Sequence, residues 1–216
     1  MDSPDISDLR RSYERGQLDL EDLNSNPFLQ FRDWFELARA TPEVIEPNAM
    51  ALSTVDAEGQ PNSRAVLLKA YDNKGFVFFT NYGSNKALEI EANRRVALLF
   101  NWLGLERQLK ILGHAERISR TDSVKYFLSR PAGSQLGAWV SDQSRVISGR
   151  GLLMSKLDEM KRKFADGKVP CPDFWGGYRI EPHQFEFWQG GRDRLHDRFR
   201  YSSTADGEWQ IERLSP

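Results

Sequence analysis

The sequence predicts a mainly β fold of the α+β class: an antiparallel barrel, closed or nearly closed, with helices packed around it. Two observations predict this class. Short apolar stretches are separated by turn sequences such as Asp56–Pro61 and Asp72–Gly75, as in an antiparallel meander. The order along the chain is a helix, several strands, several helices and further strands, without an internal repeat. A chain of 216 residues is long enough to form one such domain.

The expected elements follow from the apolar spacing. The first 25 residues are polar and are expected to form a flexible segment, while residues 26–216 are expected to form a single domain. Apolar residues at helical spacing predict a helix that begins at Pro27. The other expected helices lie at 84–93, with Ser84 as its N-cap, and at 121–130, 134–140 and 149–167. Strands are expected at 49–55, 63–71, 76–80, 94–102, 106–119, 178–191, 198–203 and 208–216.

The composition excludes several classes of protein. The formal net charge of -1 argues against a nucleic-acid-binding protein, which usually has a clear basic excess. The single cysteine, Cys171, excludes an intramolecular disulfide framework, and the three histidines have no metal-ligand spacing, so no metal is expected. No apolar run approaches the ~20 residues that span a bilayer. The N-terminus has no apolar signal core, so we expect no membrane association and a cytoplasmic location.

Two cationic residues lie on an otherwise apolar strand predicted over 64–69. Because side chains alternate along a strand, Arg64 is expected on one face and Lys69 on the other. In the functional interpretation, each face supplies a cation to a different anion. In the alternative, both are solvated side chains whose aliphatic stems cover apolar surface.

A second candidate cluster consists of Tyr126, Arg130 and Ser134. Spacings of four residues place side chains on one face of a helix. A phenol, a guanidinium and a hydroxyl on one face would form a phosphate cradle. Pro131 interrupts a continuous helix but can begin a second one, and an ordinary helix end with exposed polar residues is the alternative.

Two further segments suggest anion binding. Ser84, Asn85 and Lys86 begin a predicted helix, where free backbone N–H groups and the helix dipole favour an anion, although ordinary capping also explains them. The loop 188–198 combines a tryptophan, two glycines, three arginines and His196. A nucleic-acid patch is the competing interpretation of this loop, but the overall charge opposes it.

The sequence contains no GxSxG, GxGxxG or Walker motif, so serine hydrolase, Rossmann and P-loop assignments lack their signatures. From about Leu9 to Pro216 it resembles the pyridoxamine 5′-phosphate oxidase family instead. The most specific matching pieces, in order, are RAVLLK (64–69), LERQ (105–108), KYFLSRP (125–131), SQLGAWVSDQS (134–144), FWGGYRI (174–180) and FWQGGRDRLHDRF (187–199).

The resemblance implies an FMN-binding split-barrel fold and a homodimer with FMN at the subunit interface. It implies oxidation of pyridoxamine 5′-phosphate and pyridoxine 5′-phosphate at C4′ to pyridoxal 5′-phosphate. Electrons would pass to FMN and then to O2, which releases hydrogen peroxide. In such enzymes the cofactor performs the redox chemistry, and the protein supplies orientation and electrostatic stabilisation.

The resemblance also implies roles for individual residues. Arg64 and Lys86 would hold the FMN phosphate, supported by Thr80, Gln143 and Ser144, and Val66 and Leu67 would line the flavin. Gln108, Trp188 and Arg198 would reach the flavin from the partner subunit. Substrate phosphate would be bound by Lys69, which also borders the flavin, together with Tyr126, Arg130 and Ser134. Arg194 and His196 would contact the substrate ring as the catalytic pair, and Arg10 and Tyr13 would belong to an N-terminal segment that closes over the site.

Three positions depart from the family pattern. Asn85 stands where many relatives have a second basic residue near the FMN phosphate, so flavin binding is expected to be somewhat weaker. Phe79, a cofactor-side position, replaces a common tyrosine, and Ser12 replaces an acidic residue. Two alternative functions remain: a split-barrel flavin reductase that uses NAD(P)H, and a non-catalytic carrier of FMN or pyridoxal phosphate. The cluster at 126–134 and the RLH sequence (194–196) have no evident role in a flavin reductase.

Overall fold

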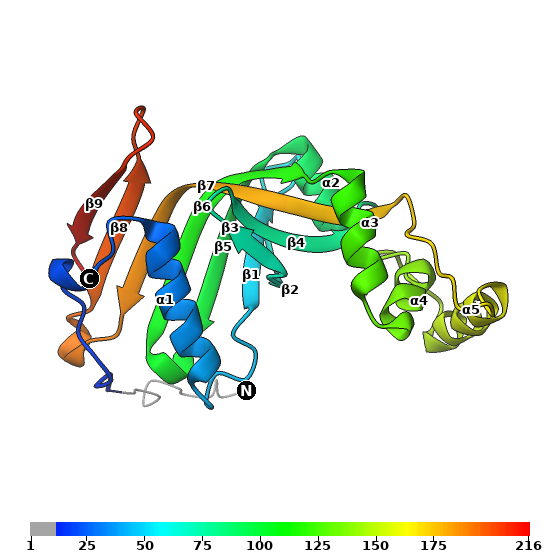
Figure 1. Cartoon of the computed structure of the whole chain (residues 1–216), viewed down its shortest axis with the longest axis horizontal. Helices are drawn as coiled ribbons and strands as arrows, with labels where there is room; N and C mark the ends of the chain where they lie inside the picture. The colour runs from blue at the N-terminus through cyan, green and yellow to red at the C-terminus, as the bar shows by residue number, and fades with distance from the viewer. Residues whose placement is uncertain (1–11) are drawn as a thin grey trace, which may run out of the picture. The chain divides into compact units, whose positions relative to one another are not determined.

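The computed structural model of the protein describes residues 12–216 (Figure 1). The chain divides into two compact units. The first contains the residues up to Asn48 together with Leu99–Ile111 and His183–Pro216, and the second contains Ala49–Leu98 and Leu112–Pro182. The expected division into a flexible segment over 1–25 and a single domain over 26–216 stays a prediction.

The second unit is built on a curled antiparallel sheet, which confirms the predicted fold class. The strand order of the sheet is β2-β1-β5-β6-β7-β4-β3, and β5, β6 and β7 each also include residues of the first unit. In chain order these strands are β1 (Ala49–Val55), β2 (Pro61–Leu67), β3 (Ala70–Asp72), β4 (Gly75–Asn81), β5 (Arg95–Trp102), β6 (Arg107–Arg117) and β7 (Trp175–Gln189). Strict alternation explains β1, in which every second side chain is buried.

The strand predicted over 63–71 is two strands. β2 ends at Leu67, and β3 pairs with β4 instead of continuing beside β1. Between them Leu68 is buried, and the backbone N–H of Lys69 donates to Val77 O at 2.8 Å. Lys69 is therefore not part of β2, and the expected alternation from Arg64 to Lys69 on one strand is wrong.

The helices of the second unit are α2 (Asn85–Ala92), α3 (Arg120–Ser129), α4 (Ala132–Val140) and α5 (Arg150–Lys163). Ser84 occupies the N-cap position of α2, but its side chain makes no capping hydrogen bond. α3 ends at Ser129, and its C-cap Arg130 has an extended backbone because the following residue is proline. Pro131 is the N-cap of α4. Tyr126, Arg130 and Ser134 therefore do not share one helical face.

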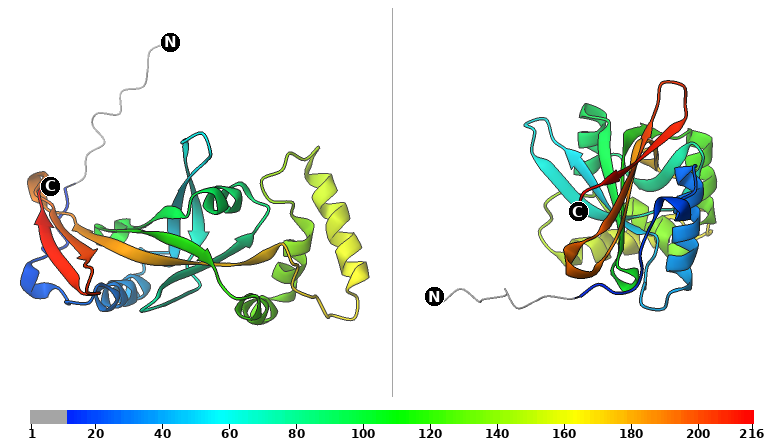
Figure 2. Two further views of the ribbon diagram at one scale, coloured as in Figure 1. Left: turned by 90° about the horizontal axis from the view of Figure 1, so that it is seen from above. Right: turned by 90° about the vertical axis from the view of Figure 1, so that its left-hand side faces the viewer.

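In the first unit, the end of β7 pairs with β8 (Asp197–Ser203), and β8 pairs with β9 (Trp209–Leu214), the hairpin that is coloured red in Figure 2. Helix α1 (Pro27–Ala40) begins where the Asn26 side chain accepts from Phe28 N at 2.9 Å, with Pro27 at its first position as predicted. Short 3-10 turns, η1 (Leu20–Asp22), η2 (Leu103–Leu105) and η3 (Arg192–Arg194), complete the unit.

Aromatic side chains form the core of the first unit. The ring of Trp34 from α1 meets that of Phe187 edge to face at 5.0 Å between centroids, and Phe28 meets Phe185 at 5.3 Å. Each fully buried ring of this size contributes about 1.5–3 kcal/mol of burial free energy.

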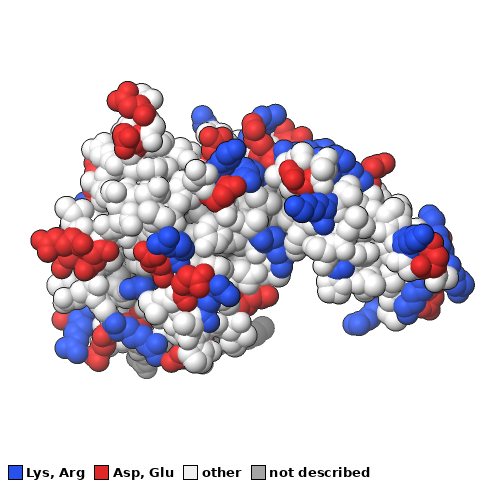
Figure 3. All heavy atoms as spheres, viewed as in Figure 1, with Lys and Arg blue, Asp and Glu red and all other residues white. Residues whose placement is uncertain are grey.

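Basic and acidic side chains are interspersed on the visible face of the molecule, in keeping with the net charge of -1 (Figure 3). Between residues 12 and 216, no helix is long and apolar enough to cross a membrane.

Candidate functional site

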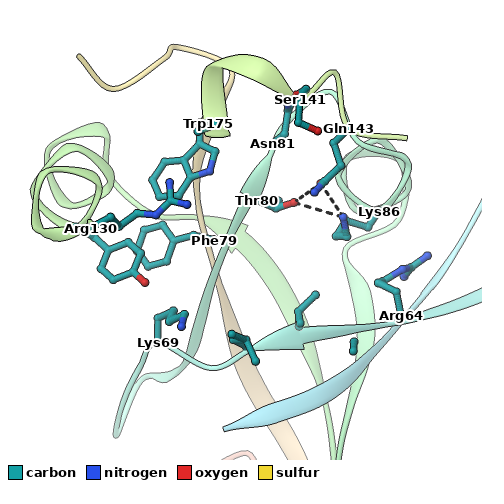
Figure 4. Close-up of a pocket in the computed structure, with 15 residues that line it drawn as sticks. Arg64, Lys69, Phe79, Thr80, Asn81, Lys86, Arg130, Ser141, Gln143 and Trp175 are labelled. Carbon is teal, nitrogen blue, oxygen red and sulfur yellow. Dashed lines mark hydrogen bonds between the residues drawn. The ribbon is translucent and has the colours of Figure 1, made fainter. Parts of the chain in front are cut away.

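A cavity of about 530 Å³ lies in the second unit, between β2, β4, α3 and the segment that follows α4. Figure 4 shows cationic side chains on two sides of it: Lys86 and Arg64 on one side, and Lys69 and Arg130 on the other. Arg64 and Lys69, which the functional interpretation of the sequence assigns to two anions, thus border one shared cavity. The complete lining consists of Arg64, Ala65, Val66, Leu67, Lys69, Phe79, Thr80, Asn81, Lys86, Tyr126, Arg130, Ala138, Ser141, Gln143 and Trp175.

Lys86 is held by oxygen atoms at the first side of the cavity. Its ammonium donates to Gln143 Oε1 at 2.8 Å and lies 3.4 Å from Thr80 Oγ1, and the Thr80 hydroxyl donates to the same Gln143 oxygen at 2.9 Å (Figure 4). Burial lowers the pKa of Lys86, the charge of Arg64 lowers it further, and Glu89 opposes the shift. An anion bound beside this half-buried ammonium would favour its charged form and so oppose the downward shift of its pKa.

Arg64 reaches this side of the cavity from β2 and is fixed by neighbours that surround its tip. Its Nη1 donates to Leu52 O at 3.1 Å and to Thr54 Oγ1, and its Nη2 donates to Glu89 Oε2 at 3.1 Å. The register explains the first contact, because Leu52 lies opposite Arg64 in the β1–β2 pair. Glu89 is 9% exposed and therefore needs these partners.

At the second side, Arg130 has a buried nitrogen with no hydrogen-bond partner among the described residues: Nη1. Its guanidinium lies over the indole of Trp175, with Cζ 4.7 Å from the ring centroid. Burial lowers the pKa of Arg130, while the nearby Tyr126 and Cys171 raise it. Because a buried unsatisfied donor is costly, this nitrogen is suited to an acceptor supplied by a ligand.

Aromatic rings line the cavity beside Arg130 and form a wall there. The rings of Tyr126 and Phe79 stack with centroids 3.9 Å apart, and Phe79 and Trp175 stack at 5.3 Å. Burial raises the pKa of the Tyr126 phenol, although Arg130 opposes the shift. Tyr126 therefore stays protonated at neutral pH and can donate a hydrogen bond to an anion in the cavity.

Three residues of the second unit that were expected at this site do not line the cavity. Asn85 is exposed, and its backbone N–H donates to Ser144 Oγ at 3.2 Å, so Ser144 braces the first turn of α2. Ser134 is exposed on α4. The break between α3 and α4 brings Tyr126 and Arg130 to the cavity without Ser134.

The first unit holds a separate aromatic group made of Tyr13, Trp188 and His196. The ring centroids of Trp188 and His196 are 4.6 Å apart, and Tyr13 meets each of them edge-on at 5.7 and 5.8 Å. His196 Nδ1 accepts from Gly191 N at 3.1 Å, which leaves Nε2 as the protonated nitrogen of the neutral ring. A Cβ on Gly190 would lie 2.7 Å from the Tyr13 ring, so only glycine admits this approach.

Two arginines of the same unit differ in their environment. Arg194 is exposed, with a left-handed backbone (φ 64°) that is uncommon outside glycine and is typical of functional loops. Arg198 is bound to Glu186 through Nε at 3.0 Å and Nη2 at 2.6 Å. Burial alone would raise the pKa of the Glu186 carboxyl, but hydrogen bonds from Lys110 and Arg198 outweigh it, so the pKa lies below its usual value. Gln108 is half-buried on β6, and Arg10 lies outside the described residues.

The sequence predicts no role for two carboxylates that the structure places among hydrogen-bond donors, Glu89 and Glu106. Glu89 joins Arg64, and the buried Glu106 accepts from the backbone N–H groups of Glu14 and Arg15 at 2.8 and 2.9 Å. Glu106 lies within the LERQ sequence, so its position in a recognised motif was a usable signal. Glu89 had none, because its partners are 25 to 35 residues away.

The fold and the cavity together define a class: a barrel-type antiparallel protein with a small-molecule cavity that has cations on two sides. Residues 37–163 match the family model described as pyridoxamine 5′-phosphate oxidase, and residues 175–216 match that of the pyridoxine 5′-phosphate oxidase C-terminal dimerisation region. The chain belongs to the pyridoxamine 5′-phosphate oxidase family.

Similar proteins cover the whole chain. The pyridoxine/pyridoxamine 5′-phosphate oxidase of Rippkaea orientalis is 58% identical, and that of Aliarcobacter butzleri is 57% identical; in both cases the match spans 98% of this chain and 100% of the relative. The crystal structure of PhzG from Burkholderia lata, in complex with tetrahydrophenazine-1-carboxylic acid, aligns with a TM-score of 0.85 at 29% identity, over 93% of this chain and 100% of that one. A pyridoxamine 5′-phosphate oxidase-related, FMN-binding protein from Nostoc punctiforme has the same fold, with a TM-score of 0.70 at 15% identity over 86% of this chain and 97% of that one.

Proposed function

We propose that this protein is a pyridoxal 5′-phosphate synthase that works with FMN and O2. It oxidises pyridoxine 5′-phosphate and pyridoxamine 5′-phosphate at C4′ to pyridoxal 5′-phosphate. Two electrons leave the substrate and reduce O2 to hydrogen peroxide, and in the amine reaction water enters and ammonia leaves. Bound FMN would supply the redox chemistry by accepting the two electrons and passing them to O2.

The observation that supports this function is the cavity with cations on two sides. FMN and the substrates each end in a phosphate, so a site for both needs two separate groups of donors. Lys86 with Thr80 and Gln143 forms one group, and Arg130 with Tyr126 and Lys69 forms the other. The unpartnered Nη1 of Arg130 and the desolvated ammonium of Lys86 fit phosphate oxygens.

In this proposal, Arg64, Lys86 and Thr80 hold the FMN phosphate, while the β2 residues Val66 and Leu67 border the flavin. Gln143 orients Lys86 by accepting its hydrogen bond. Ser144 and Asn85 support the start of α2, and Phe79 separates the two groups of donors as part of the aromatic wall.

Substrate phosphate is held by Lys69, Tyr126 and Arg130 in this proposal. Binding energy from the phosphate is remote from C4′, so it serves to align the reacting carbon and not to stretch a bond. Ser134 is the weakest member of the group, because it is exposed and does not line the cavity.

The residues of the first unit would act across a homodimer interface, with FMN bound between subunits. Gln108, Trp188 and Arg198 would approach the flavin of the partner subunit, and Arg194 and His196 would orient the substrate ring. Arg10 and Tyr13 would belong to the segment that covers the site. The match of residues 175–216 to a dimerisation region supports this assembly.

A peroxide assay with pyridoxamine 5′-phosphate tests the function. Purified protein should be yellow, with about one FMN per subunit, and should release hydrogen peroxide and pyridoxal 5′-phosphate in equal amounts. Pyridoxamine without its phosphate is the matched control and should react far more slowly. Turnover of NAD(P)H in place of the substrate would identify a flavin reductase, and flavin binding without peroxide would identify a carrier; either result would overturn the proposal.

A further inference from the structure

Glu89 lies directly behind the proposed FMN phosphate site, although it does not line the cavity. Its side chain is 10% exposed, and its carboxylate accepts from three side chains. Oε2 accepts from the Thr54 hydroxyl and from Arg64 Nη2 at 3.1 Å, and Oε1 accepts from Asn62 Nδ2 at 2.9 Å. A buried negative charge next to an anion site repels the anion, so the presence of Glu89 there needs another explanation.

The donors of Arg64 supply that explanation. A guanidinium has five N–H donors in a rigid plane. At the end of this plane, Nη1 and Nη2 each direct one N–H outward, side by side. Thr54 Oγ1 and Glu89 Oε2 are also side by side, because they are hydrogen-bonded to each other, so they accept these two N–H groups. The second N–H of Nη1 donates to Leu52 O. Among the described residues, Nε has no hydrogen-bond partner, and one N–H of Nη2 remains beside it.

These two remaining donors form the side edge of the guanidinium, the parallel pair that binds two oxygens of a carboxylate or phosphate at once. We propose that Glu89 is a positioning residue: with Thr54 it occupies the end of Arg64 and so leaves the side edge to bind the flavin phosphate. The inference rests on the proposed function, because it assigns the ligand of this edge. It also explains why a carboxylate is compatible with the site, since its charge is neutralised by Arg64.

The proposal predicts different effects on phosphate binding for two substitutions at one position. Glu89→Gln keeps one oxygen that can accept from Thr54 and Arg64, removes the charge, and replaces the acceptor of the Asn62 hydrogen bond with an NH2 group, which the Asn62 side chain can accommodate by turning its own amide oxygen toward it. Glu89→Ala removes the acceptor, so the guanidinium can rotate and loses its fixed edge. A residue that acted only through its charge would strengthen phosphate binding in both variants, and a residue needed only for folding would weaken the binding of any flavin.

The experiment is a titration of flavin-free protein with FMN and, separately, with riboflavin, in which the quenching of flavin fluorescence reports binding. The ratio of the riboflavin Kd to the FMN Kd isolates the contribution of the phosphate. In Glu89→Ala this ratio should fall about 10- to 100-fold, the range expected for a charged hydrogen bond. In Glu89→Gln the ratio should stay within about threefold of wild type or rise. Riboflavin affinity should change little in either variant.

Three further variants test whether the effect acts through Arg64. Combined with Arg64→Ala, the change Glu89→Ala should lower the ratio no further, because a positioning residue has nothing left to orient. Thr54→Val is nearly isosteric and removes one acceptor at the end of Arg64, so it should also lower the ratio, and it tests the proposal if Glu89→Ala does not fold. Glu91 lies on the same helix as Glu89 and pairs with Arg117 of β6, so Glu91→Gln is the matched control and should leave the ratio unchanged.

The wild-type chain could bind FMN more tightly than riboflavin while Glu89→Ala and Thr54→Val leave the ratio unchanged. That result would overturn the role of Glu89 and leave the proposed phosphate site standing. Additive effects of the Arg64 and Glu89 substitutions would do the same. Equal affinity of the wild-type chain for FMN and riboflavin would overturn the proposed phosphate site itself, and this inference with it.

Discussion

Replacing Arg130 gives the sharpest test of the substrate side of the cavity. Its Nη1 is buried without a partner in the described chain, and its plane lies over Trp175 at 4.7 Å. A hydrogen bond between this nitrogen and a phosphate oxygen would contribute about 1.5–3 kcal/mol, as charged hydrogen bonds do. Arg130→Ala should therefore lower kcat/KM for pyridoxamine 5′-phosphate about 10- to 150-fold, mainly through KM.

The assay is steady-state peroxide release at saturating FMN, with pyridoxamine as the substrate that lacks the phosphate. Arg130→Lys is the matched variant: it keeps the charge and loses the planar fork, so its kcat/KM should lie between those of wild type and Arg130→Ala. The reactivity of pyridoxamine should hardly change, because the missing contact is to the phosphate. If kcat/KM fell equally for both substrates, Arg130 would support the packing around Trp175 and would not bind the phosphate.

Three other predictions follow from the charged groups. FMN affinity should fall as pH rises through the alkaline range. Burial lowers the pKa of Lys86 in the free chain and a bound phosphate would raise it, so binding at alkaline pH requires proton uptake. An FMN Kd that stays constant between about pH 8 and 10.5 would contradict this, and riboflavin, which has no phosphate, is the control. Glu186→Ala should lower the free energy of unfolding at pH 7 by about 1–3 kcal/mol, because Lys110 and Arg198 lose their shared acceptor. Since the folded-state pKa of Glu186 lies below its unfolded value, this stabilisation is present above the unfolded pKa and is lost as pH falls through the folded one, so urea melts of variant and wild type should converge in acid. Glu106→Ala should speed hydrogen exchange at the amides of residues 14 and 15 at least tenfold, with Glu106→Gln, which keeps one acceptor, showing a smaller effect; equal exchange in all three proteins would refute the anchoring role.

The sequence predicts the class of fold well, because alternation and turn residues are local properties. β1 alternates as expected, and Pro27 begins α1. The errors occur where the chain changes partners. The segment after Leu67 keeps an apolar pattern, yet its neighbour changes from β1 to β4, and alternation contains no information about which strand lies alongside. The helix break at Arg130 was visible through Pro131, but its effect on Ser134 depends on the direction of the next helix.

Cationic residues of the site are easier to find in a sequence than the groups that orient them. Arg64, Lys86 and Arg130 lie in short motifs, and their type alone suggests an anion. Glu89 gains its role from a contact over 25 residues of chain, and a glutamate on a helix is unremarkable in a sequence. Gln143 contacts Lys86 over 57 residues, and it is identified only because it lies in the SQLGAWVSDQS sequence (134–144). The orienting groups decide which edge of a guanidinium, or which direction of an ammonium, is left for a ligand. In the proposed site, a change at Glu89 would therefore alter phosphate affinity while every residue of the matching sequence pieces stays in place.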